Sequence, residues 1–570
     1  MNKMLKKGLL MFAAGAFVAS CADYNETYNF AADPDPSYSV AYADLAPVKE
    51  YINRTDNPNL SVNTNILLTE FNNQALEHAA AVTNFNGVAF GYSFMPDKYV
   101  SKKGYMNFMA FKDALGHASE IGTEVYGSPI VANEQQSDEW FGYLTAPIEV
   151  QVLPIDDKEI DYTTVDEFTG TYEGRNKPTI VKDLDDKGNA LQLPTRAKVY
   201  IIEDFDLDLL GYYTITFTVK TKKDKDENIQ CTFADSLINT GKDKEGKLIA
   251  KKFPVRPGVW QTVKVEAMPS KEAKKGYFKI EGNLNTELYI RNVKVIHTPD
   301  NHRDQTKDEK SDTIQYAIRK WCDGLMEANA GRIKSFDLID KPLGTTTLAD
   351  NPDILDLKHS TDKIFWQDYL DEGDKSGSEL YGATVSKVAR AAFQKHGGNL
   401  DELKFYISEA GLEDQQRFNS LMHWIGVWEE NGAVIDGINA ELNLVYSEDA
   451  SKLADTKANL NTLIENLVKT GKKVRLSNLD IKYEDAEGNP VTANQITKEQ
   501  RQKLADFNAE VVKAYMTIPA DQQGGLCKGN MADNTTTAKD PVGLWTKETN
   551  SWVRNATYEA FCKALAGKVN

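Results

Sequence analysis

The sequence is poor in cysteine and histidine, with five and seven of these residues among 570. Cys231, Cys322, Cys527 and Cys562 are widely spaced and form neither a CxxC pair nor a metal-ligand pattern. We therefore expect them to be buried as small hydrophobic residues. The histidines are scattered as well, and no two of them have the spacing that a zinc site uses. Nothing in these residues predicts a metal or redox centre.

The sequence is also poor in positive charge and in long apolar runs. Lys and Arg number 66 against 84 Asp and Glu, which gives a net charge of −18 and argues against a nucleic-acid partner. No continuous apolar stretch after residue 21 reaches the length needed to span a bilayer. The mature chain is therefore expected to contain no transmembrane helix.

The N-terminus carries a short apolar run, residues 8–19, between three lysines and Cys21. This run is too short to cross a membrane, and the whole segment resembles a bacterial lipoprotein signal peptide. The resemblance implies that residues 1–21 are the signal peptide and that Cys21 is the lipidated N-terminus of an outer-membrane protein, with display at the cell surface favoured over retention on the periplasmic face. Residues 22–58 are polar and aperiodic, which predicts a tether.

Strand-like and helix-like patterns alternate from residue 59 to 146 and again from 307 to 570. The expected strands are 62–68, 87–90, 124–131, 335–339, 403–408, 434–439, 473–478 and 525–530. The expected helices are 72–82, 108–121, 311–330, 379–395, 414–431, 452–470, 498–516 and 555–565. Repeated βα units of this size predict an α/β fold, a (β/α)8 TIM barrel with a parallel sheet.

Residues 147–298 break this pattern with short alternating strands separated by charged turns. The expected strands are 198–202, 212–219, 229–233, 260–267, 277–282 and 287–296. Such spacing is typical of an all-β sandwich. The sequence thus predicts a TIM barrel interrupted by an inserted all-β jelly-roll sandwich, with residues 297–306 as a polar linker back to the barrel.

Two segments carry a family resemblance. Residues 332–342, R-I-K-S-F-D-L-I-D-K-P, resemble the W-D-V-V-N-E strand of glycoside hydrolase family 10, mostly endo-β-1,4-xylanases, and residues 476–481, L-S-N-L-D-I, resemble its I-T-E-L-D-I strand. Each family segment carries a catalytic Glu, and these positions are Lys341 and Asn478 here. A retaining glycosidase needs two carboxyl groups about 5 Å apart. The resemblance therefore implies a pseudoenzyme with no catalytic pair at these positions.

Most positions that match the family's sugar-contacting residues also differ. The family's Glu, Asn and Lys on strand two correspond to Gly91, Tyr92 and Met95, its first His to Ser128, and its Trp-His pair to Ala132 and Asn133; Gln135, Trp140, Asp337 and Asp480 match the family. The family's Asn and Asp on strand five correspond to Ser408 and Glu409, its Gln and His on strand six to Glu441 and Asn443, and its Trp on strand eight to Lys528. The candidates for ligand contact are Tyr92, Asn133, Gln135, Trp140, Asp340, Lys341, Glu409, Glu441, Asn443, Asn478 and Lys528 in the barrel, and Tyr172 and Tyr212 in the insert.

The insert's closing strand, L-Y-I-R-N-V-K-V-I, resembles the last strand of jelly-roll carbohydrate-binding modules. Sugar binding there needs exposed aromatic faces. The aromatic candidates are Tyr162, Phe168, Tyr172, Tyr212, Tyr213, Trp260 and Tyr289, of which Trp260 is expected in the core. No cofactor is expected, and the one candidate for a structural Ca²⁺ site is the run of Asp183, Asp185, Asp186, Gly188 and Asn189, where a solvated turn is the favoured alternative.

Three functions follow from these patterns. The favoured one is a non-catalytic surface lipoprotein that captures a polysaccharide or oligosaccharide, xylan-like in class, beside outer-membrane glycan transporter subunits. The second is a glycoside hydrolase with relocated chemistry, in which two of Asp340, Glu409 and Glu441 form a new acid and base. The third is an assembly subunit of an outer-membrane glycan-uptake complex that binds protein and not sugar.

Overall fold

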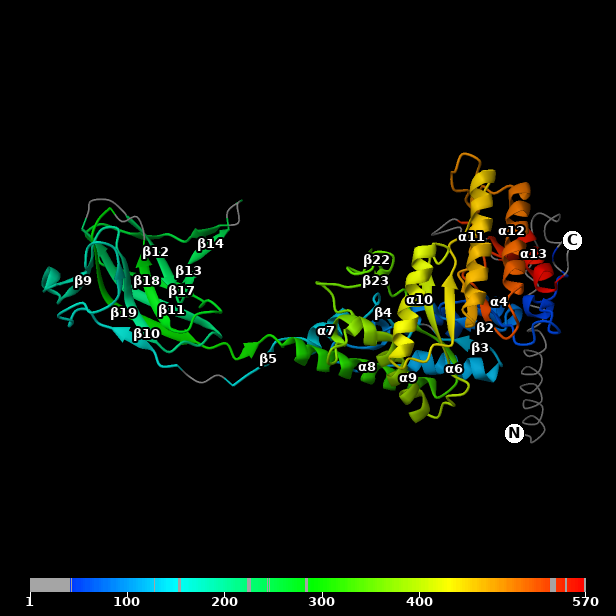
Figure 1. Cartoon of the computed structure of the whole chain (residues 1–570), viewed down its shortest axis with the longest axis horizontal. Coiled ribbons are helices and arrows are strands. Elements are labelled where there is room, and N and C mark those ends of the chain that lie inside the picture. Colours follow the sequence, from blue (N-terminus) through cyan, green and yellow to red (C-terminus); the bar gives the residue numbers. More distant parts are fainter. Residues whose placement is uncertain are drawn as a thin grey trace, which may run out of the picture. The chain divides into compact units, whose positions relative to one another are not determined.

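The computed structural model describes residues 42, 44–127, 129–151, 155–222, 227–242, 244, 247–281, 285–533, 540–548 and 551–567. The chain divides into two compact units, which Figure 1 shows. One unit contains the described residues up to Thr145 and from Thr306 onward, and the other contains Ala146–Gln305. The second unit is thus inserted into the first, and each is described separately below.

The first unit is a closed barrel of parallel strands, as predicted. The strands in barrel order are β1 (Val62–Asn65), β2 (Gly87–Ala89), β3 (Glu124–Tyr126) with β4 (Val131–Ala132), β21 (Ser335–Asp340), β24 (Lys404–Ala410), β25 (Gly437–Glu441), β27 (Lys473–Ser477) and β29 (Gln523–Lys528). β3 and β4 are successive parts of the third strand position. β29 pairs with β1, and β21 pairs with β4 and bridges to Gly127, so that the sheet closes.

The barrel closes at Gly127 because this residue has no side chain. A Cβ atom there would lie 2.1 Å from the ring of Phe336, which no relaxed packing allows. The amide of Gly127 donates a hydrogen bond of 2.8 Å to the carbonyl of Ser335. Strands three and four can therefore approach closely enough to pair.

Helices cover the outside of the strands (Figure 1). They are α3 (Leu68–Asn72), α4 (Leu76–Asn84), α5 (Pro96–Tyr99), α6 (Met109–Glu120), α7 (Asp138–Leu144), α8 (Lys307–Asn329), α9 (Gly377–Lys395), α10 (Gln415–Glu430), α11 (Ala450–Lys469), α12 (Lys498–Met516) and α13 (Ala556–Leu565). Thr306, Ser376 and Thr497 begin α8, α9 and α12 with capping boxes, in which Ser or Thr is followed three residues later by Glu or Gln. Their apolar faces and the outward-facing strand residues form one large core.

The second unit is an antiparallel β-sandwich. One sheet has the order β13 (Ser236–Leu237), β12 (Glu227–Phe233), β18 (Gly276–Glu281), β10 (Lys198–Phe205) and β7 (Tyr172–Glu173), with β16 (Phe253–Val255) on β12. The other has the order β17 (Gln261–Ala267), β11 (Tyr212–Thr221), β19 (Leu288–Thr298), β9 (Ala190–Leu193) and β8 (Thr179–Val181), with β6 (Lys158–Ile160) on β19. Their alternating apolar residues enclose a separate core. The predicted all-β insert is present.

Part of the predicted linker 297–306 is strand. β19 continues to Thr298, and β20 (His302–Arg303) pairs with β5 (Ile148–Glu149). The side chain of Gln305 donates a hydrogen bond of 3.1 Å to the carbonyl of Ala146. The two ends of the insert therefore lie side by side, because backbone pairing and not a free linker joins them.

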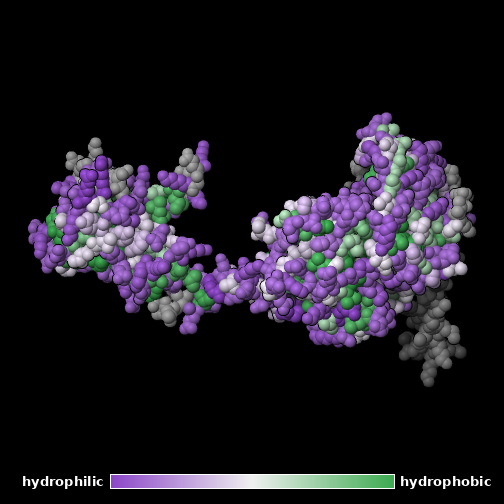
Figure 2. Space-filling view, in the orientation of Figure 1, coloured by the Kyte–Doolittle hydropathy of each residue, from purple (hydrophilic) through white to green (hydrophobic). Residues whose placement is uncertain are grey.

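The surface in Figure 2 is mostly hydrophilic on both units. Cys231, Cys322, Cys527 and Cys562 are all free and buried, which confirms their predicted packing role. No helix in the described part of the chain is long and apolar enough to cross a membrane. Cys21, the signal peptide and most of the predicted tether lie outside the described residues.

Candidate functional site at the barrel mouth

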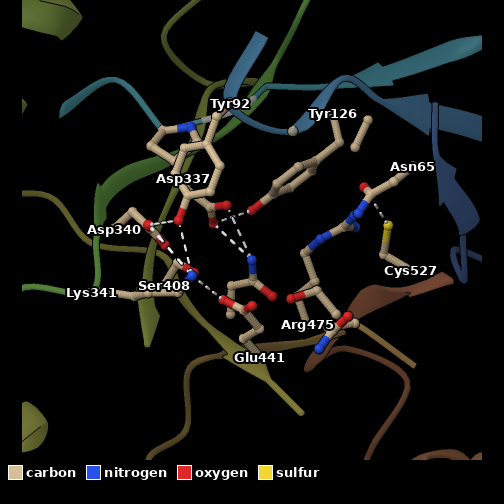
Figure 3. Close-up of a pocket in the computed structure, with 16 residues that line it drawn as sticks. Asn65, Tyr92, Tyr126, Asp337, Asp340, Lys341, Ser408, Glu441, Arg475 and Cys527 are labelled. Carbon is tan, nitrogen blue, oxygen red and sulfur yellow. Dashed lines mark hydrogen bonds and ion pairs between the residues drawn. The ribbon is translucent and has the colours of Figure 1, made fainter. Parts of the chain in front are cut away.

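A cavity of about 130 Å³ opens at the barrel mouth, the end of the barrel where the strands have their carboxyl termini (Figure 3). Active sites of TIM barrels lie at this end. Its lining residues are Asn65, Ala89, Gly91, Tyr92, Tyr126, Pro129, Asp337, Asp340, Lys341, Ser408, Asn439, Glu441, Arg475, Ser477, Asn478 and Cys527. Every barrel strand position contributes at least one of them or a neighbour of its last residue. The upper barrel interior is thus polar, whereas a TIM barrel is usually filled there by branched apolar side chains.

Lys341 is the centre of a polar network at this mouth. Its ammonium lies 2.8 Å from Glu441 Oε2 and 3.9 Å from Asp340 Oδ2, and it donates a hydrogen bond of 2.9 Å to the hydroxyl of Tyr92. The Tyr92 hydroxyl in turn donates to Asp340 Oδ2 at 2.5 Å. Figure 3 shows these groups converging from β21, β25 and the turn after β2.

The charges in this network stabilise one another. Burial alone would lower the pKa of Lys341, but Asp340, Glu441 and Tyr92 outweigh it and hold that pKa above its usual value. Burial raises the pKa of Asp340, although Lys341, Tyr92 and Ser408 act in the opposite direction. Burial and the neighbouring Asp340 also raise the pKa of the Tyr92 phenol. The Tyr92 phenol therefore stays neutral and donates a hydrogen bond to the Asp340 carboxylate.

Asp337 lies deeper in the barrel. Its carboxylate accepts a hydrogen bond of 2.8 Å from the Tyr126 hydroxyl and two of 3.1 Å from the Asn439 amide. Burial, together with the charge of Asp340, raises its pKa to about 7 in spite of these donors and of Arg475. Asp337 is thus poised to change protonation near neutral pH.

Lys341 and Asn478 stand at the positions that match the family's two catalytic Glu residues. Both line the cavity, and they follow β21 and β27 directly. Asn478 donates a hydrogen bond of 2.8 Å from its amide to the carbonyl of Leu442. Neither side chain is a carboxylic acid. Asp340 and Glu441 are acidic and lie on either side of the Lys341 ammonium. A single ammonium therefore contacts both carboxylates (Figure 3).

Several predicted residues lie away from the cavity. Glu409 is fully buried, 2.8 Å from Arg417 of α10, and accepts hydrogen bonds from the amides of Leu343 and Ala410. Burial raises its pKa, although Arg417 opposes the shift. Lys528 is buried against Asp480 and the carbonyl of Leu479. Glu409 and Lys528 are thus structural, and Glu409 is not available as the relocated acid or base.

Three further barrel candidates also fail to line the cavity. Trp140 is fully buried on α7, where it stacks on Phe141 with ring centroids 5.6 Å apart. Asn133 is buried, and neither of its amide atoms has a hydrogen-bond partner among the described residues. Asn443 is exposed but lies outside the lining. Ser128, the position of the family's first His, lies outside the described residues.

A wider groove of about 820 Å³ continues from the cavity and shares Asn65, Gly91, Tyr92 and Asn478 with it. Gln135, another predicted contact, lies at this groove with its side chain exposed. The remaining lining residues are Ile66, Leu67, Glu70, Glu77, Phe90, Ser93, Lys98, Gly529, Asn530, Met531, Ala532, Asp533, Lys547 and Trp552. A deep pocket that opens into a longer groove suits a chain-like ligand with one inserted unit.

Most aromatic candidates of the insert are in its core: Tyr162, Phe168, Tyr213 and Tyr289 are buried. Tyr212 is 46% exposed, and Tyr172 is half-buried. Trp260 was expected in the core, but it lies just before β17, half-buried. The guanidinium of Arg291 lies 4.2 Å from its ring centroid. The expectation was wrong because this tryptophan packs on a charged side chain at the sheet surface.

The candidate Ca²⁺ loop already holds two cationic side chains. Arg291 donates hydrogen bonds of 2.5 and 2.8 Å to the carbonyls of Leu184 and Gly188, and one of 3.1 Å to Asn189. Asp185 accepts from Lys220 at 2.7 Å and from the Trp260 indole at 2.9 Å. Nor do the described residues contain a group of three or more His, Cys, Asp or Glu side chains that could hold a metal. The oxygen atoms of the loop therefore accept hydrogen bonds from Arg291 and Lys220.

Sequence patterns pointed to the strand ends and missed the barrel interior. Arg475, Asn439 and Tyr126 line the cavity but follow from no family motif. The available signal was strand alternation: in K-V-R-L-S, Val474 and Leu476 belong to the outer core, so Arg475 must face inward. An arginine inside a strand of this kind is a candidate site residue.

Comparison with known families supports the barrel assignment. Residues 297–560 match the model of glycosyl hydrolase family 10. The match covers strands four to eight of the barrel, and thus the segments that contain Lys341 and Asn478. No curated protein matches the chain.

Similar solved structures include the endo-1,4-beta-xylanase XylE of Penicillium canescens, with 13% identity and a TM-score of 0.49 over 92% of this chain and 98% of that one. Xylanase B of Clostridium stercorarium F9 has 12% identity and a TM-score of 0.49, over 91% and 99% of the two chains. Xylanase 10B of Thermotoga maritima has 10% identity and a TM-score of 0.48, over 92% and 98%.

Proposed function

We propose that this chain is a glycan-binding protein that holds a polysaccharide in a degenerate family 10 barrel without cleaving it. The match of residues 297–560 to that family supports a glycan as the ligand. The observation that carries the proposal is the position of the Lys341 ammonium between the carboxylates of Asp340 and Glu441. A glycosidase needs one carboxyl group to protonate the leaving oxygen and one to attack or to activate water, with the bond between them. Here a single ammonium contacts both carboxylates.

The site still suits binding. The cavity of about 130 Å³ offers hydroxyl, amide and charged groups, and the groove of about 820 Å³ beside it extends the contact surface. A sugar hydroxyl both donates and accepts hydrogen bonds, so a mixed polar lining matches it. We propose a xylan-like polysaccharide or oligosaccharide of several units as the ligand class.

The proposed setting is the outer membrane. The lipoprotein-like N-terminus supports a lipid anchor at Cys21, and a surface-displayed glycan binder would work beside the subunits of an outer-membrane glycan transporter. A palmitate-labelling experiment with a Cys21→Ser control tests the anchor. Equal labelling of the two chains would contradict it.

The test of the proposed function uses the soluble chain from residue 22 onward. A polysaccharide array followed by isothermal titration should find saturable binding, while a reducing-sugar assay on the same samples should find no new chain ends. A second chain, in which a short Gly-Ser linker replaces residues 146–305, locates the site. Retained affinity assigns the ligand to the barrel, and lost affinity assigns it to the sandwich. Partner lipoproteins captured without any glycan binding would instead favour the assembly-subunit function.

A glycoside hydrolase remains the second candidate, because Asp340 and Glu441 share the cavity. It predicts release of reducing ends by the native chain and loss of that release in the double variant Asp340→Asn, Glu441→Gln. Glu409→Gln is not an informative control, because the Glu409 carboxylate is buried in an ion pair with Arg417 and its loss would change the packing there. No release from the native chain, or release that survives in the double variant, removes this candidate.

A further inference from the structure

One charged side chain in the cavity lining has no carboxylate in direct contact among the described residues. Arg475 is 2% exposed and lines the cavity, and its guanidinium lies 3.6 Å from the ring centroid of Tyr126. Its Nε has no hydrogen-bond partner, and no carboxylate in the described part of the chain lies within 4.0 Å of the guanidinium. Its charge persists nonetheless, since a guanidinium is not deprotonated in proteins.

The buried arginines Arg291 and Arg501, and the half-buried Arg417, do have partners. Arg501 lies 2.6 Å from Asp533, Arg417 lies 2.8 Å from Glu409, and Arg291 donates to three backbone carbonyls. Such pairing is the rule, because a buried charge without a partner is costly. Arg475 departs from this rule, and it does so in the lining of a cavity that a ligand can enter.

The acidic side chains of the cavity are engaged elsewhere. Asp340 accepts from Tyr92, Glu441 from Lys341, and Asp337 from Tyr126 and Asn439. The other unpartnered buried atom in the lining is Asn439 Oδ1, an acceptor. Among the described residues the lining thus holds one guanidinium without a carboxylate within 4.0 Å and one amide oxygen without a partner, which match an anionic group beside a hydroxyl.

The size of the cavity limits the ligand. A buried water needs about 10–15 Å³ of such volume, so about 130 Å³ holds roughly ten waters or one pyranose unit. The guanidinium is a planar fork that fits a carboxylate with two parallel hydrogen bonds. The Tyr126 ring behind it fixes its plane.

We propose that the cavity binds a sugar unit that carries a carboxylate, a hexuronic acid, with the carboxylate on the guanidinium of Arg475. This inference rests on the proposed glycan-binding function and specifies its ligand. The free acceptor of Asn439 takes a hydroxyl of the same unit. The neutral part of the chain continues along the groove that Asn65, Gly91, Tyr92 and Asn478 share with the cavity.

Asp337 couples this binding to pH. The groups that act on it are Arg475, Asp340, Tyr126 and Asn439, with Tyr406 and Cys527 also nearby. In its ionised form Asp337 competes for the positive field of Arg475, and in its protonated form it does not. Uronate affinity should therefore increase as the pH falls from 8 to 6, with net proton uptake on binding, whereas the affinity for a neutral sugar should stay constant.

The test is isothermal titration of the chain from residue 22 onward with glucuronate and galacturonate oligosaccharides, with neutral oligosaccharides of equal length, and with a sulfated sugar. We expect the uronates to bind at least tenfold more tightly than the neutral sugars. Arg475→Met should reduce uronate affinity by about tenfold to a hundredfold, as expected for a hydrogen-bonded charge pair, and should change the affinity for neutral sugars much less. Its melting temperature should not fall, because the change removes an unpaired buried charge.

Arg501→Met is the matched control, since Arg501 is equally buried but paired. It should lower the melting temperature and leave the uronate preference intact. If Arg475→Met does not fold, Arg475→Lys replaces it, and an unchanged uronate preference in that variant overturns the inference. Equal affinity for acidic and neutral sugars, or a preference for the sulfated sugar, overturns the inference alone. No binding to any sugar overturns the proposed function as well.

Discussion

Asp337→Asn should make the barrel more stable at alkaline pH. The Asp337 pKa is about 7 in the folded chain against 3.8 for an unperturbed aspartate. Each unit of difference corresponds to about 1.4 kcal/mol, so ionised Asp337 lowers the free energy of unfolding by up to about 4 kcal/mol. The folded state binds more protons than the unfolded state between these two pKa values. The contribution of Asp337 to the free energy of unfolding is therefore greatest near pH 4 and is lost as the pH rises through 7.

Asparagine has the same shape and no charge. Its Oδ1 can accept the hydrogen bond from Tyr126, and its amide can donate to Asn439 Oδ1, which has no partner in the native chain. The stability gain of the variant should therefore be small at pH 4.5 and reach several kcal/mol at pH 8. The substitution removes the free-energy cost of the buried, ionised Asp337 carboxylate without opening a cavity.

The assay is thermal and urea unfolding of both chains from pH 4.5 to 8, followed by tryptophan fluorescence. Of the eight tryptophans only Trp260 lies in the sandwich, so the signal reports mainly on the barrel. Asp540→Asn, a change outside the cavity lining, is the control for a general charge effect. A difference between variant and native chain that stays constant from pH 5 to 8 would refute the reasoning.

Three other experiments test the remaining contacts. A double-mutant cycle can be built from Lys341→Met, Glu441→Gln and the variant with both changes. For this partly buried pair we expect a coupling energy of about 1–2 kcal/mol in urea unfolding. Additive effects of the two changes would show that the Lys341 ammonium does not hold Glu441. Arg501→Met should cost about 3–5 kcal/mol, because it strands the buried carboxylate of Asp533; a loss below 1 kcal/mol would contradict that. Arg291→Met should speed hydrogen exchange in the loop whose carbonyls it caps, and unchanged protection there would show that the loop holds itself.

Much of the barrel could be predicted because its signals are local. The expected helices 311–330, 379–395 and 498–516 begin within four residues of α8, α9 and α12, whose starts carry capping boxes, and the strands are apolar runs bounded by polar residues. Lys341 and Asn478 were placed correctly at the cavity because they follow such strands directly. Sequence reasoning succeeds where one segment determines its own conformation.

The direction of individual side chains could not be predicted in the same way. Glu409 and Lys528 also end barrel strands, yet Glu409 turns to Arg417 on the next helix and Lys528 turns to Asp480 beyond the neighbouring strand. Each partner lies in another element, and only the closed barrel brings the pair together. Trp260 was misassigned for the same reason, since its partner Arg291 lies on a different strand.

The difference between a site that binds and a site that cleaves lies in which polar groups remain free. At the barrel mouth the carboxylates that could do chemistry, Asp340 and Glu441, are already bound to Tyr92 and Lys341. The guanidinium of Arg475 has no carboxylate in direct contact and an unpartnered Nε among the described residues, and it can neither donate a proton to a leaving oxygen nor attack a carbon. A guanidinium in the lining that no carboxylate contacts can bind an anionic ligand, but it cannot itself supply or accept a proton. This arrangement supports the proposed recognition of an acidic sugar and gives the Arg475 guanidinium no part in the proposed alternative of hydrolysis.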